Sequence, residues 1–196
     1  TKNERCTKMS DVKNVNTVDS TANPAPLGLC GFGLTTILLN LHNAEFFALD
    51  TTIMTMGIFY GGLAQLIVGI MEWKKNNTFG TLAFSSYGMF WLSLVGIWTL
   101  PALGGVAVPS ATSMACYLGL WGLFTLPLFI GTFKLTRALQ VTFGTLTALF
   151  FLLSIAKATG NHEIHRFAGY VGIVCGGAAF YTAMAQVLNE VYKKKM

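Results

Sequence analysis

The residues best suited to contact a solute are neutral polar side chains that stand within long apolar stretches of the chain. Such groups must find a hydrogen-bond partner or line a wet cavity, because lipid offers them no partners. No Arg or Lys stands among them, so an anion would be held weakly by hydroxyls, amides and helix ends. Each can also form a helix–helix hydrogen bond, which is the commoner role. The side chains are Thr35, Thr36, Asn40, Gln65, Ser85, Ser86, Tyr87, Gln140, Thr142, Thr145, Thr147, Thr182, Gln186 and Asn189.

A proline-rich heptapeptide, Asn23-Pro24-Ala25-Pro26-Leu27-Gly28-Leu29, precedes the first apolar stretch. Proline is favoured in the first turn of a helix and excluded further in, so a helix is predicted to begin at about Pro26. The uncharged stretch Leu27 to Leu41 is shorter than the about 20 residues that a spanning helix needs. This predicts a short, discontinuous first helix that begins inside a membrane. Its free N–H groups would face a carboxylate, with the Asn23 amide beside them.

The composition of the 196 residues indicates a multi-span membrane protein: 53% are hydrophobic, 11% are charged, and none is charged between Asn76 and Phe133. We predict an all-α polytopic fold with six transmembrane helices. The expected spans are about 26–41, 51–71, 79–100, 113–133, 138–156 and 167–191. The expected organisation is a polar, disordered N-terminal tail (1–22), a transmembrane domain (23–192) and a basic C-terminal tail (193–196).

The basic residues predict the orientation of the chain. Eleven of the 13 Lys and Arg residues fall in the two tails and the connections on their side, whereas Lys157 and Arg166 fall on the other. Cytoplasmic segments carry the excess of positive charge, so both termini are predicted to be cytoplasmic, in a protein of the cell (inner) membrane. The net charge of +5 is thereby explained by topology, and no nucleic-acid partner is expected.

Glycines recur at close spacing within two spans, at Gly57-x-x-x-Gly61 and at Gly169-x-x-Gly172-x-x-x-Gly176-Gly177. Small residues at these spacings let helices approach closely in lipid. We expect tight packing within one chain, with a subunit interface as the alternative.

Cysteine and histidine do not form a pattern typical of a cofactor site. Cys6, Cys30, Cys116 and Cys175 are far apart and contain no C-x-x-C pair, so no metal is expected. The histidines are predicted in connections, so no haem or other cofactor is expected either.

The acidic residues lie near span ends, so no proton relay through mid-span carboxyls is predicted. Proton coupling would then use the substrate's own carboxyl or the end-of-span groups. Glu72, close to Lys74 and Lys75, is interpreted as an interfacial anchor, with a role in proton coupling as the alternative.

The heptapeptide resembles the signature of the acetate uptake transporter family. The similarity covers about residues 23–192 and includes Gly31-Phe32-Gly33-Leu34-Thr35-Thr36, Ser85-Ser86-Tyr87-Gly88 and Val187-Leu188-Asn189-Glu190. The resemblance implies six transmembrane helices per chain, a homo-hexamer, and a pore through each protomer for acetate and related monocarboxylates, with succinate as a second substrate. It also implies a hydrophobic constriction made by Phe32, Tyr87 and Leu146.

An apolar ring of this kind disfavours hydrated ions and admits a small solute that can shed its water. Ala179 is small enough to leave room for the solute beside the fifth span. The candidate substrate path therefore comprises Asn23, Pro24, Pro26, Leu27, Thr35, Ser85, Ser86, Thr142 and Ala179 around the constriction.

These features predict membrane transport of small carboxylates, without enzymatic activity, as a proton-coupled symporter or an anion channel. The sequence leaves open which of the two it is. The alternatives are an integral-membrane scaffold and a haem or redox membrane protein, the latter of which would need His pairs or a Cys cluster inside the spans.

Overall fold

The computed structural model describes residues 21–194, and the regular structure within that range is entirely helical. Most of the predicted N-terminal tail, with its four basic residues, lies outside the described residues, as does part of the basic C-terminal tail. The elements are α1 (Ala25–Asn43), α2 (Thr51–Met56), the π-helix η2 (Gly57–Ala64), α3 (Gln65–Lys74), α4 (Thr78–Thr99), the 3-10 helix η3 (Leu100–Leu103), α5 (Ala111–Gly131), the 3-10 helix η4 (Thr132–Lys134), α6 (Arg137–Thr159) and α7 (His162–Tyr192).

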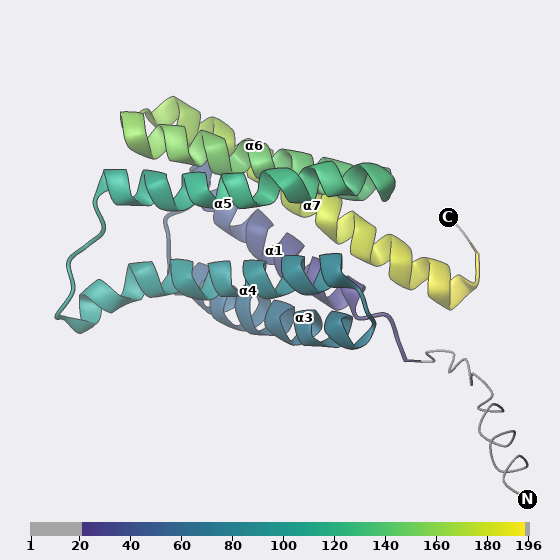
Figure 1. Ribbon diagram of the computed structural model, residues 1–196. Coiled ribbons are helices and arrows are strands. Elements are labelled where there is room, and N and C mark those ends of the chain that lie inside the picture. The colour runs from purple at the N-terminus through teal and green to yellow at the C-terminus, as the bar shows by residue number, and fades with distance from the viewer. Residues whose placement is uncertain (1–20, 195–196) are drawn as a thin grey trace, which may run out of the picture.

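Six helical segments of the described chain are long and apolar enough to cross a membrane, which confirms the predicted spans. The second span joins α2, η2 and α3 into one continuous segment, Thr51–Lys74. In Figure 1, α5 and α6 lie on one side of the bundle, α3 and α4 lie on the other, and α1 and α7 run between them. The described chain begins and ends at the same end of the bundle, which we call the proximal end; the opposite end is the distal end.

Polar residues in the connections start most of the spans. A side-chain oxygen immediately before the helix accepts a backbone N–H of the first turn, which would otherwise be unpaired. The caps are Asp50 for α2, Asn77 for α4, Ser110 for α5, Thr136 for α6 and Asn161 for α7.

The first span starts differently. Helix α1 begins at Ala25, one residue before the predicted start, with Pro24 as its N-cap and no side-chain cap of the usual kind. The Asn23 side-chain carbonyl instead accepts the Ala25 N–H at 3.1 Å, and its amide donates to Gln186 Oε1 of α7 at 2.9 Å. The start of the first span is thus joined to the last. At 19 residues, α1 is the shortest of the six spans and is continuous to Asn43.

Glycines bring α1 and α7 into close contact. A Cβ placed on Gly176 would lie 2.6 Å from the Gly33 carbonyl oxygen, and one on Gly33 would lie 2.7 Å from the Gly176 carbonyl oxygen. One turn before Gly176 in α7, Gly172 packs directly on the Asn40 side chain of α1. Gly169, Gly172 and Gly176 of the last span therefore pack within the chain, as predicted, whereas Gly177 does not.

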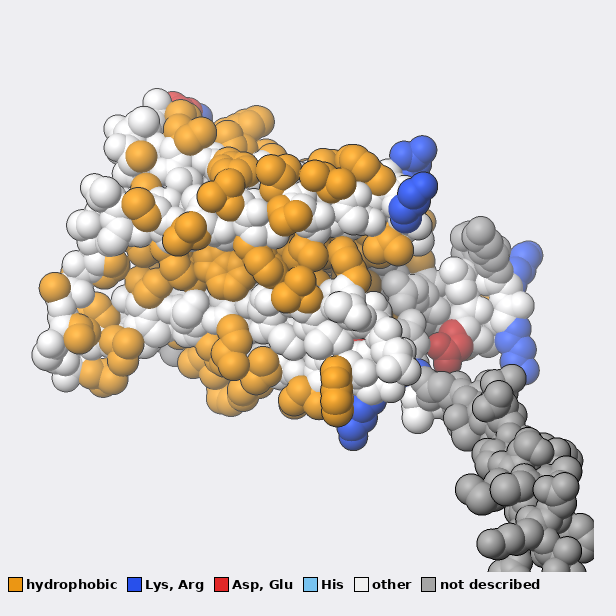
Figure 2. All heavy atoms as spheres, viewed as in Figure 1, with side chains coloured by type: hydrophobic (Ala, Val, Ile, Leu, Met, Phe, Trp, Pro, Cys, Tyr) orange, Lys and Arg blue, Asp and Glu red, His pale blue; other side chains and the backbone are white. Residues whose placement is uncertain are grey.

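The outer surface is apolar over the spans. Large exposed side chains such as Phe59, Leu120 and Val174 lie along the helices, which suits contact with lipid. Figure 2 shows apolar side chains over the middle of one face and Lys and Arg side chains gathered at the proximal end.

We expect Gly176→Ala to destabilise the protein by about 1–3 kcal/mol, because the added methyl group would overlap the Gly33 backbone. The neighbouring Gly177 is a matched control, since a Cβ there meets nothing within 4 Å. Gly177→Ala should leave stability unchanged or raise it, because Ala is the better helix former by about 1 kcal/mol. Thermal unfolding of the purified protein in detergent measures both; equal melting temperatures for the two variants would contradict the α1–α7 contact.

Candidate functional site

A cavity of about 200 Å³ opens near the proximal end of the bundle, between α1, α3, α4, α6 and α7. We call it the proximal cavity. It is lined by Ala25, Leu29, Phe32, Gln65, Asn77, Phe79, Gly80, Ala83, Phe84, Tyr87, Leu135, Leu139, Thr142, Phe143, Leu146 and Gln186. None of these lining residues is charged.

The three predicted constriction residues meet in this cavity. Phe32 of α1, Tyr87 of α4 and Leu146 of α6 all line it, and each is at least nine-tenths buried. The Phe32 and Tyr87 ring centroids are 5.9 Å apart, within the range of aromatic contact. The Tyr87 hydroxyl donates to Thr125 Oγ1 of α5 at 3.0 Å, which fixes the ring in place. Three spans that are distant in sequence therefore contribute one apolar ring.

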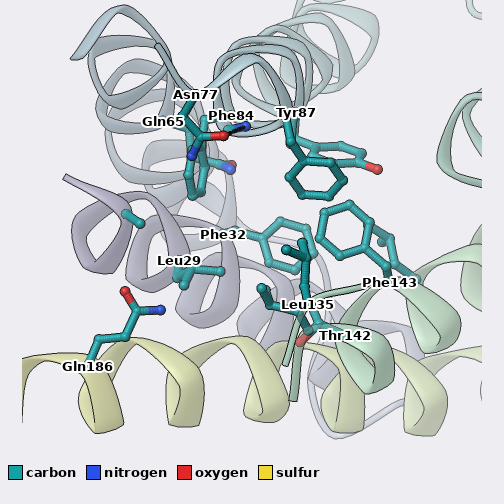
Figure 3. Close-up of a pocket in the computed structure, with 16 residues that line it drawn as sticks. Leu29, Phe32, Gln65, Asn77, Phe84, Tyr87, Leu135, Thr142, Phe143 and Gln186 are labelled. Atoms are coloured by element: carbon teal, nitrogen blue, oxygen red, sulfur yellow. Dashed lines mark hydrogen bonds between the residues drawn. The ribbon is translucent and has the colours of Figure 1, made fainter. Parts of the chain in front are cut away.

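Amide side chains form a second, polar part of the same cavity. Figure 3 shows Gln65, Asn77 and Gln186 on one side of the cavity, with Phe32, Tyr87 and Phe143 converging on the other. Gln65 is 1% exposed, and its Oε1 accepts no hydrogen bond from the described residues. Such a group is a free acceptor at the cavity wall, able to take a hydrogen bond from water or from a protonated carboxyl.

A buried carboxyl group lies directly behind the amide side of the cavity. Glu72 of α3 is 2% exposed, and its Oε2 accepts a hydrogen bond from Asn77 Nδ2 at 2.7 Å. Its Oε1 has no partner among the described residues. Glu72 is thus buried against Asn77 and Gly80, which does not fit an interfacial anchor and favours the alternative interpretation. Sequence proximity to Lys74 and Lys75 was misleading, because the helix turns this side chain inward.

A second cavity, of about 250 Å³, lies near the distal end. We call it the distal cavity. Its lining comes from α1, α4, α5, α6 and α7 and from two connections. The lining residues are Leu39, His42, Asn43, Leu49, Phe90, Leu94, Ile97, Trp98, Pro109, Met114, Leu118, Leu153, Lys157 and His165.

The two cavities lie in series along the same faces of three helices. Leu39, Leu94 and Leu153 in the distal cavity each follow a constriction residue of the proximal cavity by seven positions. Seven residues are close to two turns, or about 10.5 Å along a helix, and return to nearly the same face. The two cavities therefore lie one after the other along α1, α4 and α6.

An aromatic layer lies between the proximal and distal cavities. Phe90 lines the distal cavity one turn from Tyr87, and its ring centroid lies 5.1 Å from those of Trp121 and Phe150. Trp121 also contacts Tyr87, at 6.2 Å. An apolar layer of this kind disfavours a hydrated ion, whereas a small solute can pass if it sheds its water.

Several predicted path residues lie away from both cavities. Leu27 is 44% exposed and Thr35 is fully buried, with its hydroxyl donating to Met56 O at 3.5 Å. Ser85 packs on Gly69 of α3, and Ser86 is half-buried without lining either cavity. Pro24, Pro26 and Ala179 are also outside the lining, and Asn23 is outside it but hydrogen-bonds to two lining residues, Ala25 and Gln186. Of the predicted path, Thr142 lines the proximal cavity together with the constriction.

Four polar residues at or behind the proximal cavity were not among the predicted path residues: Gln65, Glu72, Asn77 and Gln186. The two glutamines were among the polar side chains of the spans, but nothing singled them out. Asn77 carries a local signal, because it is the capping residue of α4, yet its second role as a donor to Glu72 depends on tertiary structure.

The model of the GPR1/FUN34/yaaH family matches residues 8–193 of the chain. The succinate-acetate/proton symporter SatP of Escherichia coli (strain K12) is 58% identical over 171 residues, which cover 87% of this chain and 91% of that protein. Ammonia transport outward protein 2 of Saccharomyces cerevisiae is 39% identical over 176 residues, covering 86% of this chain and 62% of that protein.

Among solved structures, one described as the bacterial acetate channel SatP matches with a TM-score of 0.89 and 56% identity, covering 90% of this chain and 97% of that chain. The all-helical six-span fold is thus confirmed by an independent structure as well as by the spans themselves. By its sequence and its fold, the chain belongs to the GPR1/FUN34/yaaH family.

Proposed function

We propose that the chain transports acetate and succinate across the cell membrane through the two cavities and the aromatic layer between them. The observation that carries the proposal is that Phe32, Tyr87 and Leu146 line the proximal cavity together, and that the distal cavity follows about two turns further along the same three helices. The names of the relatives support it, since they describe a succinate-acetate/proton symporter and an acetate channel. They are transport proteins, which argues against a catalytic role. A homo-hexamer remains part of the proposal, on the family resemblance alone.

The route suits a small carboxylic acid. Neutral amides and the Thr142 hydroxyl offer hydrogen bonds without a fixed charge that would retain an anion, and the apolar ring accepts a methyl or methylene group. Binding is therefore expected to be weak and passage fast.

We further propose that the proximal end faces the cytoplasm. The described basic residues at that end, among them Lys74, Lys134 and Arg137, outnumber Lys157 and Arg166 at the distal end. In a variant without native cysteines, a cysteine at Lys194 should react with a membrane-impermeant maleimide only from inside. A cysteine at Gly105 in the distal connection should react only from outside. The reverse pattern of labelling would invert the proposed topology.

Glu72 is our candidate for coupling transport to protons. It is the one carboxyl among the buried polar side chains of the described residues, and its partner Asn77 lines the proximal cavity. A carboxyl that exchanges protons next to the route can link the passage of an anion to the movement of H⁺. A symporter needs such a group unless the substrate's own carboxyl carries the proton, whereas a channel needs none.

Flux in proteoliposomes tests both the transport and its coupling. The unmodified protein should take up labelled acetate, and a pH gradient should drive accumulation. Glu72→Gln keeps an acceptor for Asn77 but cannot exchange a proton, so downhill flux should persist while gradient-driven accumulation is lost. Absence of acetate uptake by the unmodified protein would overturn the function. Undiminished accumulation by Glu72→Gln would exclude this residue from coupling.

Shortening the constriction should change substrate preference. Leu146→Ala widens the ring by three carbons, so the ratio of succinate to acetate flux should rise by roughly tenfold, the scale of discrimination that apolar pockets achieve. Leu149→Ala is the matched control, because Leu149 is equally buried on α6 but lines neither cavity. That control should cost about 2–5 kcal/mol of stability and lower both fluxes alike. The same ratio in both variants, after normalisation to folded protein, would refute the assignment of Leu146 to the gate.

A further inference from the structure

The two cavities differ in charge. The proximal cavity has no charged lining residue, whereas the distal cavity has Lys157, His42 and His165 in its wall and no acidic residue. We call these three residues the basic rim. The remaining lining of the distal cavity is mostly apolar and includes Leu94, Leu118 and Leu153.

The local fold assembles the basic rim from three helices. His42 lies in the last turn of α1, Lys157 in the last turn of α6, and His165 in the first turn of α7. Gly160, with φ of 66°, allows the tight connection of α6 to α7, because a left-handed residue at that position favours glycine. His165 is close enough to Lys157, His42 and His162 to interact with them electrostatically.

The acidic side chains of the distal end leave the rim positive. Glu45 pairs with His162 at 2.9 Å, and Glu163 pairs with Arg166 at 2.6 Å. Asp50 accepts the N–H groups that open α2. None of these three acids lines the distal cavity, so none of them faces a solute held there.

We propose that the basic rim is a specificity-determining docking site for dicarboxylates. One carboxylate of a dianion such as succinate contacts Lys157 and His165, its methylene groups lie on the apolar wall, and the other carboxylate stays within the field of the same Lys157. This inference rests on the proposed function, since it assigns a role to one mouth of the same route.

The charge of the solute determines how strongly the rim acts. The Coulomb energy of a dianion near Lys157 is about twice that of a monoanion at the same place. The factor by which Lys157 raises the affinity for a dianion is therefore about the square of the factor for a monoanion. The rim is open to solvent, and salt therefore screens it: the Debye length falls from about 30 Å at 0.01 M to about 3 Å at 1 M. If Lys157 had only a structural role, the effect of replacing it would depend neither on the charge of the solute nor on the salt concentration.

The experiment compares acetate and succinate in proteoliposomes whose distal face is outward, at pH 7.5, where both carboxyls of succinate are ionised. Lys157→Gln should raise the half-saturation concentration about twofold for acetate and about fourfold for succinate, at about 0.01 M salt. At about 1 M salt, matched on both sides of the vesicle, the two increases should largely vanish.

Two controls make the result specific to the rim. Lys157→Arg keeps the charge and should preserve the ratio of the two substrates. Arg166→Gln removes a distal charge that is paired with Glu163 and lies outside the cavity, and should change neither constant appreciably. Equal losses for acetate and succinate in Lys157→Gln, or losses that ignore salt, would overturn the rim. Failure of the unmodified protein to transport either acid would instead overturn the proposed function, and the rim's role with it.

Discussion

The close contact of α1 and α7 is the constraint on which the rest of the structure depends. Gly33 and Gly176 lie backbone to backbone, and Asn40, two turns beyond Gly33, packs on Gly172. Because that face of α1 packs on α7, the adjacent Phe32 points into the proximal cavity. Asn23 and Gln186 repeat the same pairing at the proximal end with a hydrogen bond. In lipid, where apolar side chains gain little by leaving their solvent, such close backbone contact replaces the hydrophobic effect in fixing helix positions.

The proposed route is lined by different types of residue along its length. It begins with neutral amides, passes an aromatic layer and ends at a basic rim. Each part treats charge differently: amides share hydrogen bonds, aromatic rings penalise hydration, and cations raise the local concentration of anions. A solute on the proposed route would therefore meet three different environments in turn.

The spans, the helix caps and the glycine packing could be predicted from the sequence, because each depends on local composition or spacing. The direction in which each polar side chain points could not be predicted from the sequence. In a soluble helix, the polar face shows which side meets water, but these spans are apolar all round, so their rotation leaves no trace in the sequence. Ser85, Ser86 and Tyr87 are consecutive and therefore point in three directions, and only Tyr87 reaches the cavity. Phe32 and Leu146 were assigned from family resemblance alone, since composition would have placed them in an ordinary core.

The π-helix Gly57–Ala64 gave no signal that the sequence analysis recognised, yet it lies directly before Gln65 in the second span. Each i→i+5 turn holds more residues than an α-turn, so everything after it is rotated about the helix axis relative to an uninterrupted α-helix. A single helical wheel therefore does not describe the second span, and the face on which Gln65 meets the proximal cavity cannot be read from a wheel drawn from Thr51.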